Sequence, residues 1–133
     1  MKTFYGSLKI GILGGGQLGR MWIQNALNYN VNVSILDPDK DAPCKNICDD
    51  FQVGSLADFN TVYEFGKKVD LLTIEIEKVN VEALKKLVAE GVKVYPEPHI
   101  IELIQDKGTQ KEWLKEHHIP TSDFKLIDSK SDL

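Results

Sequence analysis

A glycine-rich turn between an apolar run and a helix-compatible run constrains the fold of this chain more than any other feature. After the apolar residues 10–13, Gly14, Gly16 and Gly19 follow with the spacing G-x-G-x-x-G. A strand-to-helix turn needs this spacing, because one glycine permits the sharp bend, one the close approach of a ligand and one tight helix–strand contact. Exposed amides at the start of such a helix favour an anion. The pattern therefore predicts a βα turn and leaves dinucleotide binding open.

Length and composition indicate one globular domain. The chain has 133 residues, of which 42% are hydrophobic and 27% charged, enough for a domain with its own core. The net charge of −4 and the lack of any block of like charges argue against nucleic acid as a partner, because phosphate-backbone binding needs a basic face. No stretch approaches the ~18 apolar residues of a membrane span, and residues 1–9 lack the apolar core of a signal peptide. We therefore expect a cytoplasmic protein without a membrane partner.

Two cysteines, Cys44 and Cys48, are too few for a disulfide scaffold. Their C-x-x-x-C spacing would suit a metal ion only with two further ligands, and none is near in sequence. We expect structural thiols and no metal site.

Apolar runs alternate with helix-compatible segments along most of the chain. Strands are expected at residues 10–13, 31–36, 51–54, 69–76, 92–95 and 124–127, and helices at 18–28, 55–68, 80–90, 100–104 and 106–116. Ser55, Asn80 and Asp106 are the expected N-caps. The most apolar strand, 69–76, is expected in the centre of the sheet and buried on both faces. The alternation predicts an α/β fold with a Rossmann-like doubly wound parallel sheet.

Acidic residues stand where two of these strands end. Glu75 and Glu77 end the most apolar strand, and residues two apart on a strand share a face. Both carboxylates could thus face the crevice of the glycine turn, or they could form an exposed acidic strand end. Asp37 ends the second strand, where a dehydrogenase places the acid that binds the NAD ribose. Alternatively, the sequence from Asp37 to Asp39 simply begins a turn, and the spacing does not decide between the two.

The C-terminal third carries basic residues. Lys107, Lys111 and Lys115 follow helical spacing and are typical of a solvated helix face. His117 and His118 end that helix, and we assign them no chemistry. The final residues, 129–133, look like the cap and first turn of a further helix, which suggests a truncated chain.

Several segments together resemble the N-terminal part of the N5-carboxyaminoimidazole ribonucleotide synthases, the ATPase subunits of the purine-pathway carboxylase. These segments are residues 14–21, 36–39 with 42–43, 73–77, 103–107 and 119–121. The resemblance implies a pre-ATP-grasp (biotin-carboxylase N-terminal-like) domain over residues 1–118 and the start of the ATP-grasp region over residues 119–133.

The resemblance also implies an activity. This family uses ATP and Mg²⁺ to carboxylate 5-aminoimidazole ribonucleotide with bicarbonate, through a carboxyphosphate intermediate, in de novo purine biosynthesis. By similarity, Gly16, Gln17, Leu18 and Glu75 would contact the ribonucleotide, and Lys107 the ATP phosphates. The metal-binding acids and the ATP-grasp lid would lie beyond Leu133, so we expect no catalytic residue and no turnover in this chain. The full-length enzyme would be a homodimer.

Two other functions fit parts of the pattern. A stand-alone NAD(P)-binding module of a dehydrogenase or regulator would use the glycine turn and Asp37. A degenerate homologue could serve as an interaction domain.

Overall fold

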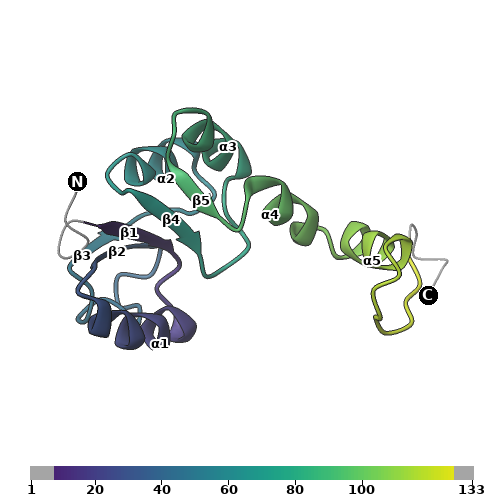
Figure 1. The fold of residues 1–133 in the computed structure, drawn as a ribbon, viewed down its shortest axis with the longest axis horizontal. Helices are drawn as coiled ribbons and strands as arrows, with labels where there is room; N and C mark the ends of the chain where they lie inside the picture. Colours follow the sequence, from purple (N-terminus) through teal and green to yellow (C-terminus); the bar gives the residue numbers. More distant parts are fainter. Residues whose placement is uncertain (1–7, 128–133) are drawn as a thin grey trace.

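The computed structural model describes residues 8–127, in which helices cover both faces of a five-stranded parallel sheet (Figure 1). In chain order the elements are β1 (Lys9–Leu13), α1 (Gln17–Ala26), a 3₁₀ turn (Leu27–Tyr29), β2 (Asn32–Asp37), β3 (Asp50–Val53), α2 (Phe59–Gly66), β4 (Leu71–Ile74), α3 (Val81–Ala89), β5 (Lys93–Tyr95), α4 (Pro98–Gln105) and α5 (Lys107–Glu116). The strand order is β3-β2-β1-β4-β5, and every neighbouring pair is parallel. The predicted doubly wound α/β fold is confirmed.

The register brings three strand ends to one edge of the sheet. Leu13 of β1 pairs with Leu36 of β2 on one side and with Ile74 of β4 on the other. The chain leaves this edge after β1 as the glycine turn and after β4 as the segment that carries Glu75. In open α/β sheets, the carboxyl ends of the strands are where ligands bind.

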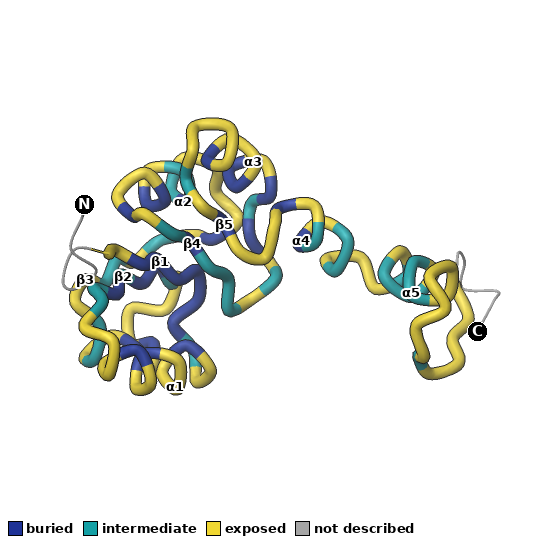
Figure 2. The backbone as a smooth tube through the Cα atoms, viewed as in Figure 1, coloured by how far each residue is buried: buried dark blue, intermediate teal, exposed yellow. Residues whose placement is uncertain are grey.

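Each face of the sheet has its own core (Figure 2). On one face α1 packs on β1 and β2, and the buried residues there are Ile12, Ile23, Ala26, Val33, Ile35 and Cys44. On the other face α2 and α3 pack on the sheet around a larger cluster that includes Leu13, Leu36, Val62, Phe65, Leu72, Leu84 and Leu87. Because side chains alternate along a strand, adjacent residues such as Ile12 and Leu13 belong to different cores.

Three of the helices, α2, α3 and α5, begin directly after a side chain that caps them. Asn80 caps α3 by accepting a hydrogen bond from the Ala83 amide, and Asp106 caps α5 by accepting one from the Thr109 amide, as predicted. The cap expected at Ser55 is wrong. Helix α2 begins at Phe59, and Asp58 directly before it accepts the amide of Thr61 at 2.7 Å. An N-cap must immediately precede the first helical residue, and Ser55 lies too early in the chain to do so.

The fourth strand and the first helix differ from what the sequence predicted. Strand β4 covers only Leu71–Ile74, and β1, not β4, is the middle strand. Only Leu72 of β4 is fully buried. On the face of the sheet that α1 covers, the helix packs over β1 and β2 and leaves β4 partly open. The first helix ends at Ala26 and continues as a 3₁₀ turn.

The expected strand at residues 124–127 is also wrong, because this segment pairs with no other strand of the described chain. Helices α4 and α5 extend away from the sheet as an arm, and residues 119–127 fold back along α5 (Figure 1). The expected helix start at 129–133 lies outside the described residues. None of the helices within residues 8–127 has both the length and the apolar character needed to cross a membrane.

Candidate functional site

The glycine turn continues β1 directly into α1. The Gly14 amide donates to the Leu36 carbonyl at 2.9 Å, which extends the β1–β2 ladder by one residue. Gly14 has a backbone φ of +103°, a conformation that residues other than glycine rarely adopt. Gly16 is the N-cap residue of α1, and no side chain caps this helix. The first amides of α1 therefore have no partner within the helix and no side-chain cap.

The Glu75 carboxylate lies directly over this turn. A Cβ atom at Gly14 would stand 2.7 Å from Glu75 Oε2, and one at Gly16 would stand 2.9 Å from Glu75 Oε1. The backbone of Glu75 is anchored there as well, since its amide donates to the Leu13 carbonyl at 2.8 Å. Gly14 and Gly16 thus make room for a carboxylate of the same chain. The structure therefore brings two of the predicted site residues, Gly16 and Glu75, into contact.

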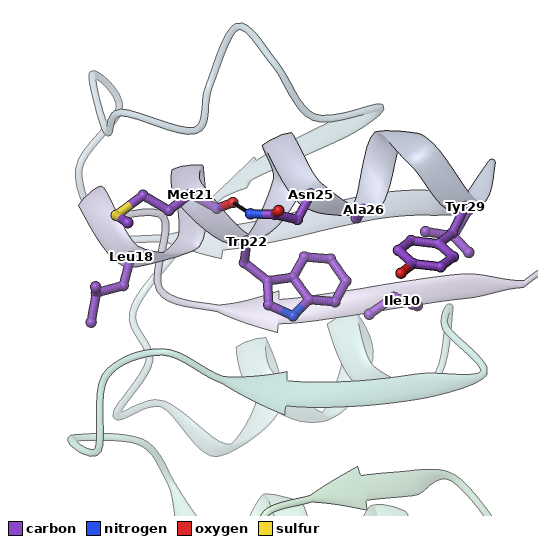
Figure 3. A pocket seen from close by; sticks show the side chains of 8 residues that line it. Ile10, Leu18, Met21, Trp22, Asn25, Ala26 and Tyr29 are labelled. Carbon is purple, nitrogen blue, oxygen red and sulfur yellow. Dashed lines mark hydrogen bonds between the residues drawn. The ribbon is translucent and has the colours of Figure 1, made fainter.

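Gln17 and Leu18 form the first turn of α1 beside this contact and are exposed. The side chain of Leu18 is 66% exposed and lies at one end of an apolar groove of about 490 Å³ (Figure 3). The groove is also lined by Met21 and Trp22 of α1, by Tyr29 of the 3₁₀ turn and by Ile10 of β1. No carboxylate, histidine or cysteine lines it, so the groove itself offers little acid–base chemistry.

Glu77 faces a different neighbour from Glu75, so the two carboxylates do not share the crevice of the glycine turn, which was one of the two arrangements that the sequence left open. Strand β4 ends at Ile74, so the alternation of a strand does not extend to these residues. Glu77 Oε1 lies 3.9 Å from Lys107 Nζ at the start of α5. The two side chains are 44% and 70% exposed, and such a pair contributes about 0–1 kcal/mol. Lys107 is thus placed beside Glu77, on the arm and not on the glycine turn.

Gln105 is a residue whose structural role the sequence patterns did not indicate. Its Nε2 donates to the carbonyls of Glu77 at 2.8 Å and of Val79 at 2.9 Å. These bonds tie the end of α4 to the segment that follows β4. Lys111, one turn after Lys107, donates to the hydroxyls of Thr121 and Ser122 and is therefore not a purely solvated lysine.

Asp37 uses both carboxylate oxygens on backbone amides. Oδ2 accepts the Gly15 amide at 2.6 Å, and Oδ1 accepts the Asp39 amide at 2.7 Å. The second bond is the turn that the sequence predicted as one of two alternatives. The first bond, to the glycine turn, could not be predicted from spacing alone. A carboxylate engaged in this way is poorly placed to bind the ribose of a dinucleotide.

The Cys44 thiol is buried against the glycine turn, close to the carboxylates of Glu75 and Asp37. The Cys44 amide donates to the Gly15 carbonyl at 3.0 Å. Burial, followed by the negative charges of Cys48, Glu75 and Asp37, raises the pKa of the Cys44 thiol from 9.0 to about 11. Burial also raises the pKa of Cys48. Both cysteines are free thiols.

The Glu75 carboxylate determines which ligand groups the glycine turn can accept. A pyrophosphate on the glycine turn would meet the Glu75 carboxylate, and like charges so close together repel. Hydroxyl and amine donors would instead find a strong acceptor. Among residues 8–127, no three carboxylate, histidine or cysteine side chains gather closely enough to hold a metal ion.

Comparisons with known proteins show the family to which the chain belongs. The family described as the ribonucleotide synthetase preATP-grasp domain matches residues 7–105. The chain is 41% identical over 119 residues to the chloroplastic phosphoribosylaminoimidazole carboxylase of Vigna aconitifolia, covering 90% of this chain and 21% of that protein. It is 37% identical over 127 residues to the N5-carboxyaminoimidazole ribonucleotide synthase of Staphylococcus epidermidis, covering 93% of this chain and 33% of that protein.

A solved structure is similar as well. The N5-carboxyaminoimidazole synthase of Aspergillus clavatus, in complex with ADP and 5-aminoimidazole ribonucleotide, superposes with a TM-score of 0.73 at 41% identity. The match covers 89% of this chain and 31% of that one. The chain thus spans a third or less of the length of these proteins. The matched family covers the sheet, the glycine turn and Glu75, and the chain belongs to the ribonucleotide synthetase preATP-grasp domain family.

Proposed function

We propose that this chain is the ribonucleotide-binding part of an ATP-dependent ligase. The full-length enzyme would join bicarbonate to 5-aminoimidazole ribonucleotide and form N5-carboxyaminoimidazole ribonucleotide. The observation that carries the proposal is the Glu75 carboxylate over Gly14 and Gly16. It makes the glycine turn a site for a ligand that donates hydrogen bonds, which suits the hydroxyls and the amine of this ribonucleotide.

Each proposed contact follows from the position of its residue. Glu75 accepts a hydrogen bond from a sugar hydroxyl or from the amine. The Gly16 backbone leaves room for the ligand, and Gln17 and the Leu18 amide complete the contact from the start of α1. The phosphate of the ribonucleotide binds to cations elsewhere, because Glu75 would repel it.

The chemistry of the proposed reaction needs parts that residues 8–127 do not supply. ATP phosphorylates bicarbonate to carboxyphosphate and leaves as ADP. The ribonucleotide amine then attacks the carboxyl carbon, a C–N bond forms as the C–O bond to the phosphate breaks, and inorganic phosphate leaves while the nitrogen loses a proton. We propose that Lys107, at the start of the arm, contributes one positive charge to the ATP phosphates. Within the described residues, its only ion pair is the one to Glu77, at 3.9 Å between Nζ and Oε1. The Lys107 side chain is 70% exposed, so its ammonium group remains accessible.

Further parts of the proposal concern the whole protein. We place the end of the pre-ATP-grasp domain at residue 118 and the start of the ATP-grasp region at residue 119. We also propose that the full-length enzyme is a cytoplasmic homodimer that binds Mg²⁺ with ATP through the ATP-grasp region. Sedimentation velocity would test the dimer.

The experiment that tests the function measures ADP formation by the full-length protein. We expect release of ADP that depends on both bicarbonate and 5-aminoimidazole ribonucleotide. No ribonucleotide-dependent ADP formation would contradict the proposal. Titration with NAD and NADP addresses the dinucleotide alternative, and binding of either at micromolar concentration would favour that alternative.

A further inference from the structure

The three consecutive glycines are packed from two different sides. Gly14 and Gly16 lie against Glu75, whereas Gly15 lies against the end of β2 and the loop after it. A Cβ atom at Gly15 would stand 3.0 Å from Ile35 Cγ2 and 3.4 Å from Asp37 Cβ. The turn is therefore held between β2 and the segment that follows β4.

Asp37 accepts the shortest hydrogen bond between the turn and β2. Its Oδ2 atom accepts the Gly15 amide at 2.6 Å in a partly buried setting. Asp37 is itself fixed as the last residue of β2, because its carbonyl accepts the Gly54 amide at 3.0 Å and its Oδ1 accepts the Asp39 amide. A hydrogen bond from an amide to a carboxylate is shorter and stronger than one between neutral groups.

This bond determines which backbone groups of the turn are left for a ligand. The Gly15 amide is occupied by Asp37, and the Gly15 carbonyl accepts the Cys44 amide. Gly15 thus offers a ligand neither its donor nor its carbonyl in this arrangement. The same two bonds fix the peptide planes on either side of Gly15 and hence the direction in which α1 begins.

We propose that Asp37 is a positioning residue for the ribonucleotide site, which holds Gly15 so that the first amides of α1 and the Glu75 carboxylate face the same ligand. This inference rests on the function proposed above. It assigns Asp37 a role different from that of the acid of a dinucleotide site, because its carboxylate binds the protein backbone and not the ligand.

The test compares Asp37→Asn with Asp39→Asn in the full-length protein. Asparagine replaces one carboxylate oxygen by an NH₂ group and removes the charge, so it cannot accept both amides as Asp37 does, and any bond that it keeps to Gly15 is no longer charge-assisted. Asp39 lies in the same loop, and its Oδ1 accepts the amide of Asp41 and not an amide of the glycine turn. We expect Asp37→Asn to raise the KM for 5-aminoimidazole ribonucleotide about tenfold. The KM for ATP should stay within about twofold, and Asp39→Asn should change neither.

Each outcome decides the proposal. An unchanged ribonucleotide KM in Asp37→Asn, with an active wild-type protein, overturns the positioning role alone. Equal increases in both KM values overturn it too, because they indicate general damage to the fold. If Asp37→Asn does not fold, Asp37→Ser, which keeps one acceptor, is measured in the same way, and failure of both to fold makes Asp37 a residue of the fold only. A wild-type protein without ribonucleotide-dependent ADP formation refutes the proposed function itself, and the role of Asp37 falls with it.

Discussion

Glu75 contacts Gly16 across the edge of the sheet: a Cβ atom at Gly16 would stand 2.9 Å from Glu75 Oε1. The two residues lie far apart in the chain and meet because β1 and β4 are paired, with Leu13 beside Ile74. Replacement of this glycine by any other residue would push the carboxylate away from the turn. The contact therefore joins the backbone and the side chain on which the proposed site depends.

Glu75→Gln in the full-length enzyme should impair use of the ribonucleotide. The substitution preserves shape and removes the charge, so a charge-assisted hydrogen bond to the ligand is lost. We expect a cost of roughly 1.5–3 kcal/mol, which corresponds to a loss of about ten- to hundredfold in kcat/KM for 5-aminoimidazole ribonucleotide. The KM for ATP should remain nearly unchanged. Steady-state kinetics with each substrate varied in turn provide the measurement.

Glu77→Gln is the matched control for that substitution. Its carboxylate faces Lys107 and is 44% exposed, so we expect a milder effect on ribonucleotide kinetics. A severe loss in Glu77→Gln together with normal kinetics in Glu75→Gln would show that the roles of the two acids are exchanged. No effect in either variant would mean that this acidic segment has no part in binding.

Two glycine substitutions should distinguish an effect on ribonucleotide binding from an effect on the stability of the core. Gly16→Ala is compatible with the backbone, since φ is −73, but its Cβ displaces the Glu75 carboxylate. We expect a higher KM for the ribonucleotide with little change in the free energy of unfolding. Gly66→Ala instead places a Cβ into the Leu87 side chain where α2 packs on α3. Overpacking of this kind costs about 1–3 kcal/mol of stability.

The two glycine variants serve as controls for each other in urea unfolding and in kinetics. For Gly66→Ala, we expect a lower unfolding midpoint and normal KM values for the folded enzyme. Loss of stability in Gly16→Ala without a change in the ribonucleotide KM would contradict the role given to the Gly16–Glu75 contact.

Cys44 should make the stability of the protein depend on alkaline pH. The fold raises the pKa of its thiol from 9.0 to about 11, because burial and nearby negative charges disfavour the thiolate. The neutral thiol stabilises the folded state below pH 9, and this contribution is lost as the pH rises from 9 towards 11. The slope is at most about 1.4 kcal/mol per pH unit.

Urea unfolding of the wild-type chain and of Cys44→Ala at several pH values over that interval measures this effect. The stability advantage of the wild type over the variant should shrink as the pH rises. Parallel stability curves for the two proteins would argue against an elevated thiol pKa.

The 133-residue chain by itself should hydrolyse no ATP above background, with or without 5-aminoimidazole ribonucleotide. Phosphoryl transfer needs metal ions and several positioned cations around the phosphates. Within residues 8–127, no three histidine, cysteine, aspartate or glutamate side chains gather closely enough to hold a metal ion. A coupled assay for ADP would detect turnover, and a clear ribonucleotide-stimulated rate from this chain would refute the proposed division between binding and catalysis.

The sequence by itself determined the local structure of this protein. The spacing of Gly14, Gly16 and Gly19 predicted the βα turn, and the polar residues Asn80 and Asp106 predicted two helix starts. These predictions hold because each depends on residues close together in the chain, where steric freedom and capping act within one or two turns. The alternation of strands and helices predicted the doubly wound sheet for a different reason, because parallel strands need a long crossover connection, which is usually a helix.

Only the tertiary structure decided where the acidic residues lie. Apolar periodicity extended the fourth strand to residue 76, but strand pairing stops at Ile74, and so Glu75 turns to the glycines while Glu77 turns to Lys107. Spacing alone left two roles open for Asp37, and the pairing of β1 with β2 placed it within reach of the Gly15 amide. The physical reason is the same in each case: a sequence pattern reports local backbone preference and burial, whereas these contacts depend on which strands become neighbours and on where their pairing ends.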